Sequence, residues 1–253
     1  MAGIKNLYLK FFRVKMAKVK SYFIKIDHNS RDGFDHIIGG INRDILCPNC
    51  EKPLFLHLSL DTRDRRLKGF NYPHRYIRLY YCMRCPLAWY DFQYLDHGDN
   101  IEIIKANTAK DKSAEEEWSS EINLDYFPER KITLQKIPSS LVKLFKKATE
   151  EGDLSESEEF KFAKLTDNFA SDAVGNYPIA DVVNQVGGYT YIPQNIDGPK
   201  CYNCERHGKN KSMVFLASLA NNPKQELEFS YDGVQILFYI CELCHTIHVQ
   251  HCC

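Results

Sequence analysis

The stretch CYNCERHGKNKSMVFLASLA, residues 201–220, places a C-x-x-C pair a short distance before a long apolar run. A C-x-x-C turn, which we call a knuckle, presents two sulfur atoms to one tetrahedral metal ion. Two knuckles complete a four-cysteine zinc site. The apolar run has the length and composition of a buried β-strand. The stretch therefore predicts half of a metal site at the end of a sheet.

Eight of the ten cysteines belong to four such knuckles: Cys47/Cys50, Cys82/Cys85, Cys201/Cys204 and Cys241/Cys244. A long chain without a secretory signal favours metal binding over a disulfide scaffold. The interval between the first two knuckles is close to that between the last two. The sequence therefore predicts two four-cysteine sites of the zinc-ribbon type, with one structural Zn²⁺ in each.

The knuckles lie within a longer repeated pattern. Gly39-Gly40 before the first knuckle corresponds to Gly187-Gly188 before the third, and an apolar run follows each of these knuckles. This similarity predicts an internal duplication. We expect a basic N-terminal segment over 1–21, a first zinc-knuckle repeat over 22–105, a polar and helical connector over 106–182, and a second repeat over 183–253.

Apolar and aromatic runs predict the strands. They cover 22–26, 54–60, 76–81 and 87–94 in the first part of the chain, and 213–219, 234–240 and 246–250 in the second. Each second knuckle is expected in a tight turn between two antiparallel strands, and each first knuckle just before a strand. Amphipathic patterns predict helices near 139–152 and 153–170. The predicted fold class is α+β, mostly antiparallel β, with two sheets.

The segment GGYTYIPQ, residues 187–194, resembles a motif of a known family when read with the following knuckle and the strand MVFLASL. This combination resembles the domain shared by YwqG-like proteins and programmed cell death protein 2, although Thr190 and Tyr191 replace the usual proline and tryptophan. The resemblance implies a duplicated, mostly β domain that binds proteins in a chaperone-like role. On this basis the partner-binding residues are expected to be Gly187, Gly188, Tyr189, Tyr191 and Gln194.

Composition limits the classes of partner. The chain has 33 basic and 33 acidic residues and a sequence pI near 7.1, so no overall field draws it to nucleic acid. No stretch reaches the roughly 20 apolar residues that span a membrane. Lysines interrupt the N-terminal apolar residues too often for a signal peptide. We expect a cytoplasmic protein.

No catalytic motif accompanies the cysteines, and a closed shell of four thiolates leaves no position for an activated water. The sequence therefore favours a non-catalytic protein-interaction module that acts as a chaperone, an adaptor or an immunity-type inhibitor. The alternative is an RNA-binding or other nucleic-acid-binding zinc ribbon, because basic residues gather in the first half: Arg63, Arg65, Arg66, Lys68, Arg75, Arg78 and Arg84.

The C-terminal sequence CHTIHVQHCC, residues 244–253, holds further metal-binding side chains. Imidazole and thiolate both suit zinc, so these residues could form an extra site or replace a knuckle cysteine. The competing interpretation is a chain end without a metal role. The side chains in question are His245, His248, His251, Cys252 and Cys253.

Overall fold

The computed structural model describes residues 18–27, 32–82, 92–98, 100–106, 128–151, 154–166, 184–189, 198–220, 227 and 235–252. The strands are β1 Tyr22–Ile26, β2 Ile37–Ile38, β3 Ile41–Leu46, β4 Pro53–Asp61, β5 Tyr76–Tyr81, β6 Phe92–Asp96, β7 Ile101–Ala106, β8 Arg130–Lys136, β9 Gln185–Val186, β10 Val214–Ala220, β11 Gln235–Ile240 and β12 Ile247–Cys252. The helices are the 3₁₀ segment η1 Arg65–Phe70, α2 Ser139–Glu151, α3 Glu156–Thr166 and α4 Tyr202–Arg206.

The described strands pair only in antiparallel fashion. Their order is β3-β4-β2-β8-β1-β9-β10-β11-β12-β6-β7. Strand β5 lies outside this order and pairs with β4. Hydrogen bonding therefore runs without a break from strands of the first predicted repeat to strands of the second. The predicted α+β, mostly antiparallel fold class is confirmed, while the internal duplication stays a prediction.

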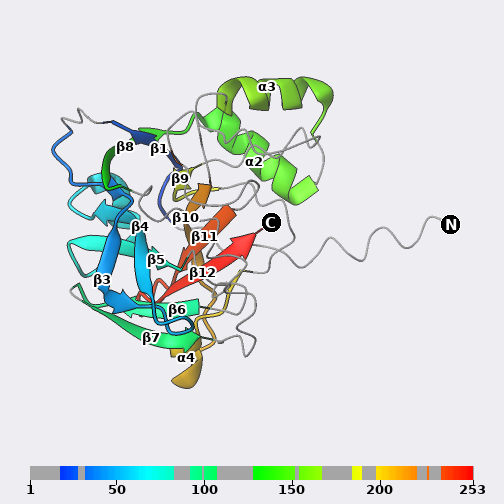
Figure 1. Cartoon of the computed structure of the whole chain (residues 1–253). Coiled ribbons are helices and arrows are strands. Elements are labelled where there is room, and N and C mark those ends of the chain that lie inside the picture. The colour runs from blue at the N-terminus through cyan, green and yellow to red at the C-terminus, as the bar shows by residue number, and fades with distance from the viewer. Residues whose placement is uncertain are drawn as a thin grey trace.

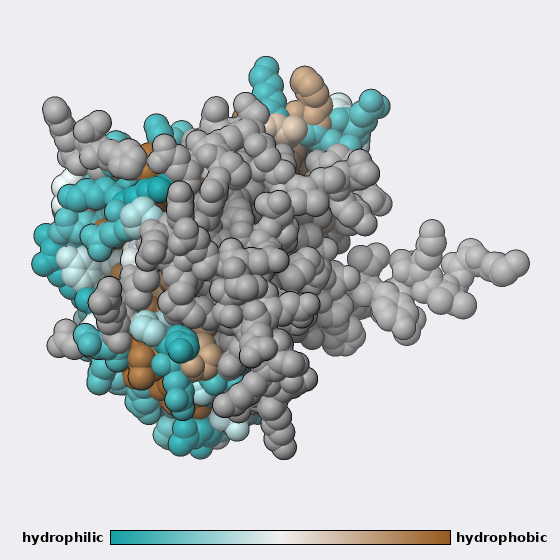
Figure 2. Space-filling view, in the orientation of Figure 1, coloured by the Kyte–Doolittle hydropathy of each residue, from teal (hydrophilic) through white to brown (hydrophobic). Residues whose placement is uncertain are grey.

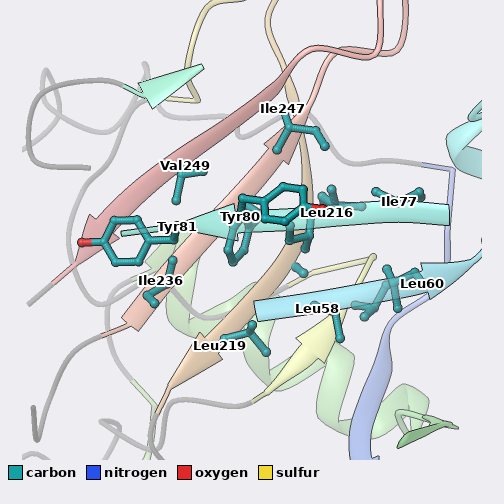
Figure 3. Packing of buried hydrophobic residues seen from close by; sticks show 14 of the residues in the cluster. Leu58, Leu60, Ile77, Tyr80, Tyr81, Leu216, Leu219, Ile236, Ile247 and Val249 are labelled. Carbon is teal, nitrogen blue, oxygen red and sulfur yellow. The ribbon is translucent and has the colours of Figure 1, made fainter. Parts of the chain in front are cut away.

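The main core lies where strands from distant parts of the chain face one another. Figure 3 shows β4 and β5 crossing over β10, β11 and β12, with apolar side chains filling the space between them. Leu58, Tyr80 and Leu216 are buried there. Because alternate residues of a strand point to opposite faces, this arrangement gives two packed layers of sheet.

A smaller core lies under helices α2 and α3, which pack together at one end of the molecule (Figure 1). Phe23 of β1 points into it, whereas its neighbour Ile24 points into the main core. Phe145 and Phe162 meet edge to face in this cluster. The two helices therefore cover part of the sheet around β1. No helix in the described part of the chain is long and apolar enough to cross a membrane.

Strands with strong apolar patterns lie where the sequence predicts them. Strands β1 and β5 match their predicted bounds, and β4, β10, β11 and β12 match within a few residues. Five described strands were not predicted. Strands β2 and β9 have only two residues each. Strands β3, β7 and β8 have the sequences INRDIL, IEIIKA and RKITLQK, which carry charges. Strand β8 comes from the predicted connector and lies between β1 and β2 in the sheet.

The positions of the knuckles agree with the prediction in part. Cys241 and Cys244 occupy the turn between the paired strands β11 and β12, as expected. The expected hairpin around Cys82 is not seen within the described residues, where β5 pairs with β4, whereas β6 pairs with β7 and β12. Residues 83–91, which include most of its second strand, lie outside the described residues. The first knuckle instead lies in a turn between paired strands, β3 and β4.

The Gly187-Gly188 turn is buried against the start of β1. Both glycines have positive φ, +65° and +64°. A Cβ on Gly188 would lie 2.6 Å from the Ser21 backbone nitrogen, and one on Gly187 would lie 2.7 Å from the Lys20 oxygen. The Ser21 hydroxyl accepts a 3.0 Å hydrogen bond from the Tyr189 backbone N–H. Close backbone packing therefore accounts for both glycines.

We predict that Gly188→Ala costs about 3 kcal/mol or more of unfolding free energy, because the left-handed conformation and the clash with Ser21 both disfavour alanine. Gly33→Ala is the matched control, since Gly33 has φ +78° and no atom within 4 Å of a built Cβ. It should cost only about 1–2 kcal/mol. Urea unfolding measures both values, and equal costs would contradict the packing explanation.

Candidate metal centres

Four cysteines from the C-terminal part of the chain converge on one point. The sulfur atoms of Cys201, Cys204, Cys241 and Cys244 all lie within 4.8 Å of one another. Three of these side chains are buried, and Cys244 is half-buried. The closest Sγ–Sγ distances are 3.3 Å for Cys201 and Cys244, 3.5 Å for Cys204 and Cys244, and 3.6 Å for Cys204 and Cys241.

These distances fit a shared metal ion. A disulfide needs sulfur atoms about 2.0 Å apart, which excludes bonds within the cluster. Sulfur ligands about 2.3 Å from a tetrahedral Zn²⁺ lie about 3.8 Å from one another. Four thiolates in this arrangement suit Zn²⁺ or an iron centre and disfavour Mg²⁺ or Ca²⁺, which prefer oxygen ligands.

The backbone positions Cys201 and Cys204 at the start of a short helix. The Cys201 sulfur accepts a 3.4 Å hydrogen bond from the backbone N–H of Cys204. The backbone N–H of Lys209 donates to the Cys204 oxygen at 2.9 Å, and Gly208 adopts φ +70°. This loop brings the chain directly into β10, the apolar run that follows the knuckle in the sequence.

The turn that carries Cys241 and Cys244 has a different backbone. The Cys241 N–H donates to the Thr246 oxygen, and the His245 N–H donates to the Cys241 oxygen, both at 2.9 Å. His245 adopts φ +60°, which is uncommon outside glycine. The Thr246 hydroxyl lies 3.1 Å from the Cys244 sulfur and can donate a hydrogen bond to a thiolate there. Sequence reasoning missed this threonine.

A second cluster gathers Cys47, Cys50 and Cys82, whose sulfur atoms also lie within 4.8 Å of one another. Cys50 and Cys82 are 3.6 Å apart. Cys85, the predicted fourth ligand, lies outside the described residues. The structure therefore brings three of the four predicted ligands together.

The first and fourth knuckles share one backbone pattern. The Cys47 N–H donates to the Lys52 oxygen at 2.8 Å, the Glu51 N–H donates to the Cys47 oxygen at 2.9 Å, and Glu51 has φ +57°. The same two hydrogen bonds and the same left-handed residue occur around Cys241. In local geometry the first knuckle thus matches the fourth, whereas the sequence pattern pairs it with the third.

The protonation chemistry of the C-terminal cluster favours a bound cation. Hydrogen bonds to Cys241 and Cys244 raise the pKa of Cys201, and burial raises the pKa of Cys204 to about 12. Hydrogen bonds from Cys201 and Cys241 lower the pKa of Cys244. Without a cation, Cys244 is therefore stabilised as a thiolate, while Cys201 and Cys204 are stabilised in the protonated form. A divalent ion compensates the charge and allows all four to ionise.

The predicted partner-binding residues divide between buried and undescribed positions. Gly187 and Gly188 are buried, and Tyr189 is half-buried beside the α2–α3 cluster. Tyr191 and Gln194 lie outside the described residues. The backbone oxygens of Gly187 and Tyr189 accept hydrogen bonds from the Gln185 side chain at 3.1 and 2.8 Å. The described part of this motif has a clear packing role, and its role in binding stays a prediction.

The C-terminal histidines join neither cluster within the described part of the chain. His248 is buried in β12 near Gln93, and the His245 ring meets the edge of Tyr72 with centroids 5.6 Å apart. The side chains of His251 and Cys252, and all of Cys253, lie outside the described residues. The additional C-terminal metal site is therefore not seen at the two histidines that are described.

Large apolar side chains are exposed beside the ligands, a feature that sequence reasoning missed. Leu46 is 52% exposed, Leu243 is 48% exposed and Tyr202 is 36% exposed. Each lies next to a ligand cysteine in the sequence. The sequence shows apolar residues at these three positions but not their exposure, because Tyr81 and Ile240 also adjoin ligand cysteines and are buried.

No protein-family model matches the chain, and no curated protein and no solved structure shows significant similarity to it. The resemblance to the YwqG-like and programmed cell death protein 2 family, which is clearest over roughly residues 183–250, therefore stays a prediction.

We predict that Cys241→Ser removes one bound metal ion and lowers the melting temperature by at least about 10 °C, since a structural site contributes several kcal/mol. Met213→Leu is the control for local packing, because Met213 is buried in the same small core and is not a ligand. That swap conserves volume and should cost less than about 1.5 kcal/mol. A Cys241→Ser protein with full metal content would contradict the assignment of this ligand.

Proposed function

We propose that this chain is a non-catalytic protein-interaction module whose structure depends on two Zn²⁺ ions. The observation that carries the proposal is the convergence of the sulfurs of Cys201, Cys204, Cys241 and Cys244 at 3.3–3.6 Å between closest pairs. Four thiolates satisfy a tetrahedral ion completely, so no site is left for substrate or for an activated water. Zinc in such a shell stabilises structure and does not catalyse hydrolysis.

The exposed side chains beside the ligands support a binding role. The neighbouring cysteines hold the backbone in place at three exposed residues, Leu46, Tyr202 and Leu243. Figure 2 shows apolar residues gathered among polar ones at the lower edge of the molecule, in the region of β6 and β7 in Figure 1. Rigid, exposed apolar and aromatic side chains lose little entropy on binding and are typical of protein interfaces.

The charge arrangement counts against the nucleic-acid alternative. Four of the seven basic residues that favour this alternative already face carboxylates: Arg63 pairs with Asp61 and Asp35, Arg66 with Asp64 and Asp32, Arg75 with Asp35, and Arg78 with Asp96. Hydrogen bonds from Arg63 and Asp35 outweigh burial and lower the pKa of Asp61 to about 2, so this carboxylate stays ionised at neutral pH. Phosphate would have to displace these carboxylates.

Capture of partners from native lysate tests the proposal. We expect the full-length zinc-loaded chain to retain a stoichiometric protein partner at high salt, and Leu243→Asp to reduce the captured amount about tenfold or more. Phe160→Asp is the matched control, because Phe160 is a large exposed apolar residue on α3 at the other end of the molecule (Figure 1). It should leave capture unchanged.

Two results would contradict this function. Binding that disappears after nuclease treatment and falls steeply with added salt would favour the RNA-binding alternative. Equal losses in Leu243→Asp and Phe160→Asp would show that the exposed residue beside Cys244 has no particular role. Thermal melting of both variants checks that each is folded.

A further inference from the structure

Gln93 lies at the junction between the C-terminal cysteine cluster and the first half of the chain. It belongs to β6, where it is directly opposite His248 of β12, and it is only 3% exposed. A buried carboxamide is costly unless both its oxygen and its nitrogen have partners. The hydrogen-bond partners of the Gln93 side chain therefore indicate the structural role of this residue.

The carboxamide binds the peptide groups on both sides of Cys201. The Gln93 side-chain oxygen accepts a hydrogen bond from the backbone N–H of Tyr202 at 2.9 Å. Its side-chain nitrogen donates to the Lys200 oxygen at 2.8 Å and lies 3.3 Å from Nδ1 of His248. One side chain thus fixes the backbone immediately before and after a candidate metal ligand.

A second contact joins the same hairpin to the same knuckle. Lys105 of β7 places its ammonium group 4.7 Å from the centre of the Tyr202 ring, in cation–π geometry. Among the residues that the structure describes, the ladder between β6 and β12 has three paired positions, from Tyr94 to Phe92. The knuckle contacts add to this ladder in attaching the β6–β7 hairpin to the C-terminal part of the chain.

The side chains of Tyr94 and Asp96 on β6 contact strand β5. The Tyr94 hydroxyl accepts from the Tyr80 backbone N–H at 2.7 Å and donates to the Arg78 oxygen at 3.0 Å. Asp96 accepts from the Arg78 backbone N–H at 3.2 Å. Since β5 leads directly to Cys82, strand β6 contacts chain segments next to ligands of both clusters.

We infer that Gln93 is a positioning residue of the C-terminal metal centre, and that metal bound there holds the β6–β7 hairpin in the sheet. The inference rests on the proposed function, in which this cluster binds Zn²⁺. Gln93 fixes the direction in which Cys201 presents its sulfur. Conversely, a knuckle that is bound to metal keeps the Tyr202 N–H and the Lys200 oxygen in a fixed position, where both can form hydrogen bonds with Gln93 of the hairpin. Residues that orient metal ligands in this way typically change metal affinity about 10–100-fold when mutated.

Zinc release to a chromogenic chelator tests this inference in the full-length protein. Gln93→Met keeps the length of the side chain and removes its hydrogen bonds, and we expect one of the two ions to leave about tenfold faster or more. The other ion should leave at its wild-type rate. Cys82→Ser, which removes a ligand of the N-terminal cluster, identifies the phase that belongs to the C-terminal ion.

The matched control is Gln185→Met. Gln185 is also buried and also makes two side-chain hydrogen bonds to backbone groups, the oxygens of Gly187 and Tyr189, but it contacts the Gly187 turn and not a knuckle. It should lower stability while leaving both release rates unchanged, which separates positioning from general destabilisation. If Gln93→Met does not fold, Gln93→Glu serves instead. This variant keeps the acceptor for Tyr202 and loses the donor to Lys200, so its C-terminal ion should leave faster than that of the wild type.

Hydrogen exchange gives a second readout. Removal of zinc should increase amide exchange over 92–98 and 100–106 more than over β4. Wild-type release rates in the Gln93 variants, or equal acceleration in Gln185→Met, would overturn the inference while leaving two bound ions and the proposed function intact. A wild-type chain without bound metal would overturn both.

Discussion

Mutual repulsion of sulfur charges in a buried site is the constraint on which the rest of this structure depends. The sulfurs of Cys201, Cys204, Cys241 and Cys244 lie too close together to ionise independently and too far apart for disulfides. A divalent cation resolves this conflict. Its binding contributes on the order of 10 kcal/mol at neutral pH, comparable with the whole stability of a typical domain, about 5–15 kcal/mol. In our proposal zinc therefore determines whether β10, β11 and β12 keep their register at this end of the sheet.

The two clusters belong to one continuous antiparallel framework. Strand β6 of the β6–β7 hairpin comes from the first half of the chain but pairs with β12 from the second, and β1 lies between β8 and β9. Strand β6 joins these parts through side chains: Gln93 binds the knuckle of Cys201, and Tyr94 and Asp96 bind the edge of β5. Loss of either metal would consequently affect more than the nearest hairpin. This arrangement suits a rigid binding surface in which exposed residues such as Leu243 are held by ligands beside them.

The features that the sequence predicted correctly are local. Knuckles have a short, fixed spacing, and strands such as Tyr76–Tyr81 and Val214–Ala220 are rich in apolar and aromatic residues, so both could be recognised without knowing the fold. Among the strands that were missed, Ile37–Ile38 and Gln185–Val186 are too short to give a pattern, and the longer ones, such as Arg130–Lys136, carry charges because parts of them remain exposed. Their place in the sheet depends on partners far away in the chain, which no local pattern reveals.

Long-range contacts also determine the features of the site that the sequence could not show. Gly187 and Gly188 resemble a family motif and were assigned to partner binding, yet they are buried against Val19–Ser21, more than 160 residues earlier. Gln93 gave no signal, because a single glutamine in a strand becomes meaningful only when β6 meets the knuckle of Cys201. The knuckle of Cys47 likewise has the same backbone hydrogen bonds as that of Cys241, a similarity that the spacing of the cysteines in the sequence did not indicate.

Native mass spectrometry of the purified full-length chain, compared with the same sample under denaturing conditions, tests the central claim most directly. The account predicts a mass difference of two zinc ions per chain in the native sample and none after denaturation in acid. A native mass equal to that of the bare polypeptide, with the protein still folded, would contradict it.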